Sequence, residues 1–114
     1  MAAAVVHFEI IGRDGKRLQD FYGSLFDWRI DANNPMNYGL VEAAAPGIGG
    51  GITQSDGAPM VTFYVDVTDL AATLASVEKL GGKTVMPPMD VPGGPTIAMF
   101  QDPDGNTIGI MKGM

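Results

Sequence analysis

The chain has 114 residues, of which 46% are hydrophobic and 18% are charged, as expected for one globular domain with a single core. Its 13 acidic and 7 basic residues give a net charge of −6, which argues against nucleic acid and anionic membrane surfaces as partners. The absence of cysteine excludes disulfides, thiolate nucleophiles and cysteine-based zinc sites. We expect a cytoplasmic protein, because no segment has the pattern of a signal peptide or is apolar over the roughly 20 residues that span a bilayer.

The first half of the chain has the pattern of a strand, a helix and further strands. Residues 5–11 alternate as a strand does, and Asp14 can cap the helix that follows. Apolar residues of this helix recur at the spacing of one buried stripe: Leu18, Phe21, Tyr22, Leu25 and Phe26. Weaker strands follow at 28–30, 36–42 and 47–53, and a polar connector follows at 55–59.

The same pattern begins again at Met60. Residues 60–66 alternate as a strand, Asp69 can cap a second helix, and Gly81 and Gly82 can end it. Further strands are expected at 83–86, 96–101 and 106–112. A proline-rich loop is expected at 87–95, and a tight turn at 102–105. That loop is either a plain hairpin connection or a lid.

A constant offset of 55 residues relates the two halves: Val6 and Asp14 recur as Val61 and Asp69. We therefore predict an α+β fold over residues 1–114, built from two βαβββ modules at 1–57 and 58–114. Paired side by side, the two modules would form a curved mixed sheet around a cavity, with the helices on its outer face.

Alternation along the strands predicts which side chains line the cavity. With Phe8 and Ile10 facing the helices, the opposite face carries His7, Glu9, Thr62 and Tyr64. Thr107 and Met111 share the corresponding face of the last strand. Tyr38 shares a strand face with Glu42, although the sequence does not determine which face.

His7 and Glu9 are the most informative pair, because residues two apart on a strand project to the same face. An imidazole beside a carboxylate can act as acid and base, or can orient a hydroxyl or carbonyl of a ligand. The alternative is a histidine that only satisfies its own hydrogen bonds in a partly polar pocket. Further candidate ligand contacts supply hydroxyls or an adaptable apolar surface: Thr62, Tyr64, Tyr38, Thr107 and Met111.

Several motifs occur in a fixed order along nearly the whole chain: His7-Phe8-Glu9-Ile10, Phe21-Tyr22-Gly23-Ser24-Leu25-Phe26-Asp27-Trp28, Gly49-Gly50-Gly51-Ile52 and Asp102-Pro103-Asp104-Gly105-Asn106. In this order they resemble the vicinal oxygen chelate superfamily, which includes glyoxalase I, bleomycin-resistance proteins and extradiol dioxygenases. The resemblance implies paired βαβββ modules, usually in dimers. In the metal-dependent members, four side chains from the first and last strands of the modules hold a divalent ion that stabilises an enolate or oxyanion.

Only one of those four positions carries a metal ligand here. The resemblance places His7 on the first strand of module one and Thr62 at the equivalent position of module two. The last-strand positions fall in the Gly49-Gly50-Gly51 run and on Gly109. A hydroxyl and glycines cannot hold a transition metal, so we expect no cofactor. The alternative is a divalent metal on His7, with Glu9 or a partner subunit completing the site.

We expect a glyoxalase/bleomycin-resistance-like protein that binds a small organic molecule in the sheet cavity without a tightly held metal. An acidic protein with an apolar cavity suits a cationic or amphipathic ligand. A homodimer is expected, since open module edges need covering. Two alternatives remain: a metal-dependent lyase, isomerase or dioxygenase of glyoxalase type, and a metal-free enzyme that uses His7 and Glu9 as acid and base.

Overall fold

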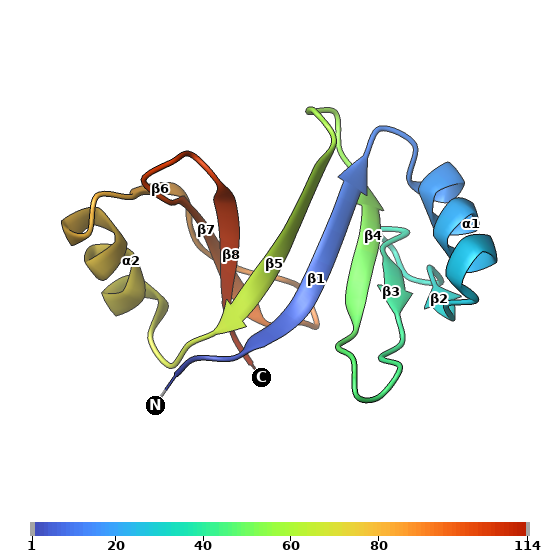
Figure 1. The fold of residues 1–114 in the computed structure, drawn as a ribbon, viewed down its shortest axis with the longest axis horizontal. Coiled ribbons are helices and arrows are strands. Elements are labelled where there is room, and N and C mark those ends of the chain that lie inside the picture. The colour runs from blue at the N-terminus through green and yellow to red at the C-terminus, as the bar shows by residue number, and fades with distance from the viewer. Residues whose placement is uncertain (1, 114) are drawn as a thin grey trace. The chain divides into compact units, whose positions relative to one another are not determined.

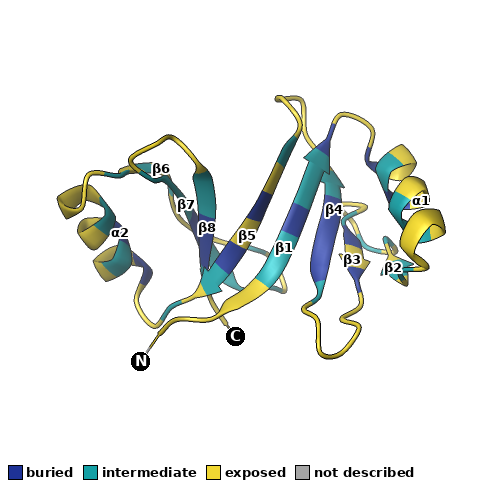
Figure 2. Ribbon diagram, in the orientation of Figure 1, coloured by how far each residue is buried: buried dark blue, intermediate teal, exposed yellow. Residues whose placement is uncertain are grey.

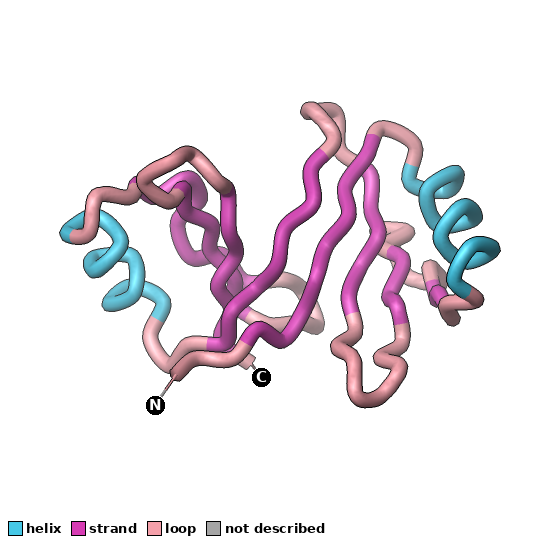
Figure 3. The backbone as a smooth tube through the Cα atoms, in the orientation of Figure 1, coloured by secondary structure: helices cyan, strands magenta, loops and turns pink. Residues whose placement is uncertain are grey.

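The computed structural model describes residues 2–113 and contains the βαβββ order twice (Figures 1 and 3). The first repeat consists of β1 (Val5–Gly12), α1 (Gly15–Phe26), β2 (Ile30–Asp31), β3 (Gly39–Val41) and β4 (Gly50–Gln54). The second consists of β5 (Met60–Asp66), α2 (Leu70–Lys79), β6 (Lys83–Asp90), β7 (Thr96–Gln101) and β8 (Thr107–Lys112). The predicted α+β class and duplicated module are therefore confirmed. Neither helix has the length and apolar character needed to cross a membrane.

Contacts within the chain define two compact units. The N-terminal unit holds residues 7–62, and the C-terminal unit holds the residues from Phe63 onward together with those up to Val6. The first residues belong to the C-terminal unit because the carbonyl of Ala4 accepts a hydrogen bond of 2.9 Å from the amide of Asp66. The boundaries between the units thus fall inside β1 and β5.

A mixed sheet forms the frame of the N-terminal unit, in the strand order β2-β3-β4-β1. β1 runs parallel to β4 and places Phe8 opposite Gly50 and Glu9 opposite Gly51. β3 is antiparallel to both β4 and β2, and the two-residue β2 is shorter than expected. Phe8 packs against Trp28, with ring centroids 5.4 Å apart, which places this aromatic contact on the opposite face of β1 from Glu9.

Helix α1 begins as predicted and contacts the sheet through a polar side chain. The Asp14 side chain accepts a hydrogen bond from the amide of Arg17, which is the expected N-cap. The buried residues of α1 are Gly15 and Gln19. The Gln19 amide donates hydrogen bonds to the carbonyl of Ile52 at 2.9 Å and to that of Asn37 at 3.1 Å. These bonds hold the Gly15–Gln19 side of the helix against β4.

The predicted burial of the apolar stripe of α1 is wrong for three of its five members, while Leu18 and Tyr22 are half-buried. The exposed fractions of Phe21, Leu25 and Phe26 are 57%, 57% and 53%, and the outer surface of the helix is exposed (Figure 2). The absence of a side chain at Gly15 lets the helix approach β4 closely, and a Cβ there would lie 3.2 Å from Gln54. The helix is therefore rotated so that much of its apolar stripe faces away from the sheet.

The C-terminal unit packs α2 on its own strands of the eight-stranded sheet, in the order β5-β8-β7-β6. β5 is parallel to β8, whereas β7 is antiparallel to both β8 and β6. The buried core between helix and sheet is Leu70, Leu74, Ala98 and Ile110, with Val65, Val67 and Phe100 packed against it. Asp69 caps α2 as predicted, and Gly81 has a φ of 96°, which favours glycine at the end of the helix.

The first part of the loop predicted at 87–95 is strand, because β6 continues through Pro87 and Pro88 to Asp90. Prolines are tolerated here since β6 is the last strand of its sheet and its register with β7 shifts between Thr84 and Met89. Only a short turn remains, closed by a hydrogen bond of 3.0 Å from the Val91 amide to the Pro95 carbonyl. The segment is thus a hairpin connection rather than a lid.

Candidate functional site

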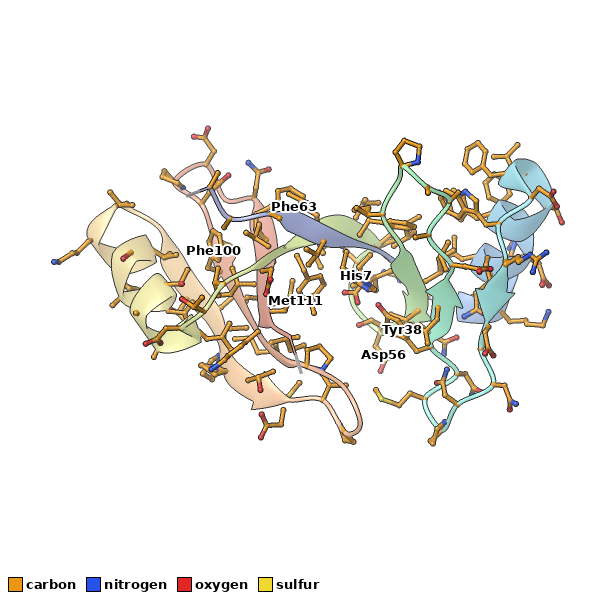
Figure 4. All side chains as sticks on the ribbon, turned by 90° about the horizontal axis from the view of Figure 1, so that it is seen from below. His7, Tyr38, Asp56, Phe63, Phe100 and Met111 are labelled. Carbon is orange, nitrogen blue, oxygen red and sulfur yellow. The ribbon has the colours of Figure 1, made fainter. Side chains whose placement is uncertain are left out.

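A chain of hydrogen bonds joins three of the predicted site residues on one face of the N-terminal sheet. The Tyr38 hydroxyl donates to the Oε2 atom of Glu9 at 2.8 Å and lies 2.9 Å from the Nε2 atom of His7. The side chains of His7 and Tyr38 face each other in Figure 4, with their ring planes 14° apart. His7 and Glu9 therefore share a strand face, as the alternation predicted, and Tyr38 lies on that same face.

The direction of these hydrogen bonds determines the tautomer of His7. A tyrosine hydroxyl has one hydrogen, and Tyr38 uses it to donate a hydrogen bond to the carboxylate of Glu9. The hydroxyl oxygen can then only accept from His7, so the Nε2 atom carries hydrogen and the Nδ1 atom of the neutral ring is an acceptor. The hydrogen bonds thus run from His7 to Tyr38 and from Tyr38 to Glu9, and the negative charge lies at Glu9.

Two further residues, Asn34 and Gly51, position the side chain of Tyr38. The Asn34 side chain accepts a hydrogen bond of 2.9 Å from the Tyr38 amide and donates one of 2.8 Å to the Tyr38 carbonyl. On β4, Gly51 leaves open the space that the tyrosine side chain fills, because a Cβ at position 51 would collide with the ring and hydroxyl of Tyr38. The ring therefore reaches His7 and Glu9 only because residue 51 has no side chain.

Burial and charge act in opposite directions on His7. Burial disfavours the imidazolium and lowers the pKa of His7 below its ordinary value of 6.5, while the nearby charge of Glu9 partly offsets this decrease. Glu9 itself is only 8% exposed, so its hydrogen bond from Tyr38 compensates for lost hydration. The lowered pKa means that His7 is mainly neutral at pH 7.

The other predicted contacts lie on β5 and β8. Thr62 and Tyr64 are buried on β5, with exposed fractions of 4% and 5%. Tyr64 lies opposite Gly109 on β8, and its ring fills the space that a side chain at 109 would occupy. Thr107 and Met111 are partly buried and alternate with the core residue Ile110. Their role in ligand binding stays a prediction.

The residues present do not fit a tightly held transition metal. No group of three or more His, Cys, Asp or Glu side chains that could hold an ion occurs within residues 2–113. The carboxylate of Glu9 and the hydroxyl of Tyr38, which lie beside His7, are hydrogen-bonded to each other. Gly51 and Gly109, on the last strands of the two modules, both lie beneath tyrosine rings. Tyrosine rings thus fill the space at positions where the family resemblance looks for ligands.

Sequence reasoning did not identify Asn34 or assign a partner to Gly51. Glycines within a strand indicate in general that backbone or a ligand approaches closely, and the close neighbour of Gly51 is the Tyr38 ring. The Asn34-Pro35 turn just before Tyr38 was the available signal for Asn34, because asparagine in turns bonds to nearby backbone. The strand predicted at 36–42 is shorter, Gly39–Val41, so Tyr38 precedes it and Glu42 follows it. The exposed Glu42 side chain lies 3.9 Å from the Nε atom of Arg29.

The repeated βαβββ order places the chain in the class of α+β proteins built from duplicated modules, and His7 and Glu9 lie on its first strand. Residues 4–110 match the family described as the Glyoxalase/Bleomycin resistance protein/Dioxygenase superfamily, and the chain belongs to this superfamily. The resemblance seen in the sequence motifs is thereby confirmed.

Similar proteins agree with this assignment. A "Glyoxylase-like domain-containing protein" from Didymella fabae is 33% identical over 112 residues, which cover 87% of this chain and 85% of that protein. Methylmalonyl-CoA epimerase from Mycobacterium tuberculosis has a similar fold, with a TM-score of 0.69 and 13% identity over 96% of this chain and 87% of its own. The Mn(II)-bound glyoxalase from Novosphingobium aromaticivorans gives 0.68 and 17%, over 97% of this chain and 40% of its own.

Proposed function

We propose that the chain binds a small organic molecule at the sheet face formed by His7, Glu9 and Tyr38, without a tightly held metal. The observation that carries this proposal is the hydrogen-bonded series from His7 through Tyr38 to Glu9. Polar side chains that converge on one sheet face and are partly buried are typical of the few groups that orient a ligand in an otherwise apolar site.

The charges of the site favour one kind of ligand. Glu9 contributes a buried carboxylate, and the whole chain has a net charge of −6. Such a field attracts cations and repels anions. We therefore favour a cationic or amphipathic molecule.

The test is a ligand screen followed by NMR spectroscopy of the histidine ring. Because the chain has one histidine, its ring signals need no assignment by mutation. Ligands that bind at this face should shift the His7 signals and should lose about tenfold or more in affinity for Tyr38→Phe, which keeps the ring and removes both hydrogen bonds of the hydroxyl. Tyr22→Phe is the matched control, because Tyr22 belongs to the aromatic cluster with Trp28.

Two results would contradict the proposal. One is a set of ligands that bind equally well to Tyr38→Phe and leave the His7 signals unchanged. The other is near-stoichiometric zinc, nickel, manganese or iron in protein purified without chelators, measured by mass spectrometry. Stoichiometric metal would favour an enzyme of glyoxalase or dioxygenase type.

The hydrogen bonds that join His7 to Tyr38 and Tyr38 to Glu9 favour a second candidate function, a metal-free enzyme that transfers protons. A ring that is mainly neutral at pH 7 can accept a proton, and Tyr38 with Glu9 can stabilise the imidazolium that results. This function requires that a ligand found in the screen be converted, and that His7→Gln abolish turnover while retaining ligand affinity within about tenfold. Binding without turnover would leave the first candidate.

A further inference from the structure

An open groove lies between α1, the end of β1 and the start of β5, and its walls are mainly apolar. It has a volume of about 520 Å³, and the residues that line it all belong to the N-terminal unit. Small-molecule sites in proteins have volumes of about 300–1,000 Å³. Phe21 and Val61 line the groove and are 57% and 72% exposed, so an apolar molecule placed there would remove apolar surface from water. The other apolar walls include Ile10, Leu18, Tyr22 and Met60.

This groove is separate from the candidate functional site. Ile10 projects to the same face of β1 as Gly12, where a Cβ would collide with Leu18 of α1. His7 and Glu9 project to the opposite face, and neither is among the residues that line the groove. A ligand in the groove would therefore lie on the helix side of β1.

Two arginines line the groove near the start of α1. Arg13 and Arg17 are both exposed, and neither makes an ion pair within residues 2–113. Lys16, which lies between them in the chain, pairs instead with Asp20 at 2.7 Å. The two guanidinium groups are therefore available to a ligand in the groove.

Asp14 also lines the groove, and its carboxylate belongs to the N-cap of α1. The Oδ1 atom of Asp14 accepts a hydrogen bond of 3.1 Å from the amide of Arg17. Asp14 is the one acidic residue among the described lining residues, and its charge offsets one of the two arginines, which leaves the lining at 2 − 1 = +1. Because the whole chain has a net charge of −6, this positive charge is local to the groove.

We propose that the groove binds an amphipathic carboxylate, such as a medium-chain fatty acid. The apolar tail lies along Leu18, Phe21 and Val61, and the carboxylate lies at Arg13 and Arg17. A guanidinium presents paired N–H donors whose geometry matches a carboxylate. This site and the proposed site at Glu9 thus favour ligands of opposite charge, and neither assignment rests on the other.

Isothermal titration calorimetry of the full chain with sodium decanoate, below its micelle concentration, measures this binding. Decanoate should bind saturably, with one molecule per chain. Octanoate should bind more weakly, by about twofold to fourfold for each methylene removed, because each methylene in the groove buries apolar surface. 1-Octanol has the same chain length as octanoate without the charge, and it should bind about tenfold more weakly than octanoate.

Two sets of variants locate the bound molecule. The double substitution Arg13→Gln with Arg17→Gln should weaken decanoate binding by about tenfold and remove the preference for octanoate over 1-octanol. Arg29→Gln, which changes an arginine outside the groove, is the matched control. Val61→Ser should weaken decanoate binding by about threefold, whereas Val85→Ser, at a 48% exposed position on β6, should not change it. Circular dichroism checks that all four proteins stay folded.

The single histidine distinguishes this groove from the site on the other face of β1. Decanoate should leave the NMR signals of the His7 ring unchanged, and Tyr38→Phe should retain decanoate affinity within about twofold. Failure of the proposed function at His7 would therefore leave this inference intact, and failure of this inference would leave the proposed function intact.

Equal affinity for octanoate and 1-octanol would overturn the proposal, because the arginines would then not select a carboxylate. Absence of saturable decanoate binding would also overturn it, including the case in which sedimentation shows that another copy of the chain covers the groove. Binding that is lost in Tyr38→Phe and kept in the double arginine variant would place the carboxylate at the His7 face, with the same consequence. Binding of one decanoate per chain that the arginine and Val61 variants weaken, and that both control variants retain, would support the proposal.

Discussion

The ring and hydroxyl of Tyr38 occupy the space that any side chain at Gly51 would fill. Since Gly51 lies opposite Glu9 in the parallel pair of β1 and β4, the missing side chain places the tyrosine hydroxyl directly at the Glu9 carboxylate. Tyr38 in turn connects Glu9 to His7. The site therefore depends on a glycine, because only a residue without a side chain leaves room for Tyr38.

Gly51→Ala should displace Tyr38 and break its hydrogen bonds to His7 and Glu9. The collision and the partly unsatisfied carboxylate should destabilise the chain by about 1–3 kcal/mol, measured by urea unfolding. Gly57→Ala is the control, because the nearest atom to a Cβ there is the Ser55 hydroxyl at 4.0 Å. Equal unfolding midpoints for the two variants would show that Tyr38 does not depend on Gly51.

Gly109 has the same relationship with Tyr64 in the C-terminal unit. Gly109→Ala should cost about 1–3 kcal/mol of unfolding free energy, because a Cβ there collides with the buried Tyr64 ring. Gly109→Glu places a carboxylate on the last strand, yet it should still purify without stoichiometric metal. Gly113→Ala, which has no atom within 4 Å of its Cβ, serves as the control. Stoichiometric manganese or zinc in Gly109→Glu would contradict this prediction.

The pKa of His7 should respond to Glu9 in a defined direction. Burial lowers this pKa and the charge of Glu9 raises it, so Glu9→Gln should lower the His7 pKa further. An NMR titration of the single histidine measures the shift directly. Glu42→Gln, which removes an exposed carboxylate near Arg29, should leave the His7 pKa unchanged. A rise of the His7 pKa in Glu9→Gln would contradict the direction assigned to the charge of Glu9.

His7 should also make folding stability depend on pH. Because its pKa is lower in the folded chain than the unfolded value of 6.5, the unfolded chain binds more protons as pH falls through this interval. The free energy of unfolding should be unaffected by His7 above about pH 6.5, fall below it, and level off once the pH is under the folded pKa. Urea unfolding of the unsubstituted chain and of His7→Gln isolates this component. Parallel curves for the two proteins would contradict it.

The buried amide of Gln19 should contribute to the position of α1. Gln19→Leu removes the two donors that reach the carbonyls of Ile52 and Asn37, at a cost of about 1–3 kcal/mol in unfolding free energy. Ser24→Ala, on the exposed side of the same helix, should change it by less than about 0.5 kcal/mol. Chemical denaturation compares the two. A Gln19→Leu variant as stable as Ser24→Ala would show that apolar contacts alone hold the helix.

Some features of the candidate site were predictable because they depend on strand periodicity. His7 and Glu9 had to share a face, since they are two residues apart on one strand. Tyr38 could be named as a candidate but not assigned to that face. It precedes β3 in a turn closed by Asn34, and the direction of its ring follows from the pairing of β3 with β4. Strand pairing between distant segments has no local signal in the sequence.

In the helices too, local features were predictable from the sequence and the orientation of the helix was not. Their N-caps at Asp14 and Asp69 were predicted correctly because a cap is a hydrogen bond between residues three apart. The spacing of Phe21 and Leu25 also predicted an apolar stripe correctly. The direction of the stripe was wrong, because it depends on which side of α1 can approach β4, and Gly15 and Gln19 determine that side.

The sequence by itself determined the duplicated βαβββ order, the helix starts and the pairing of His7 with Glu9 on one face. All of these follow from interactions between residues close together in the chain. Only the tertiary structure decided that Tyr38 lies on Gly51 and joins His7 to Glu9, and that α1 exposes Phe21 and Leu25. Those features arise where segments distant in the sequence compete for the same space, and close packing then determines which side chain occupies it.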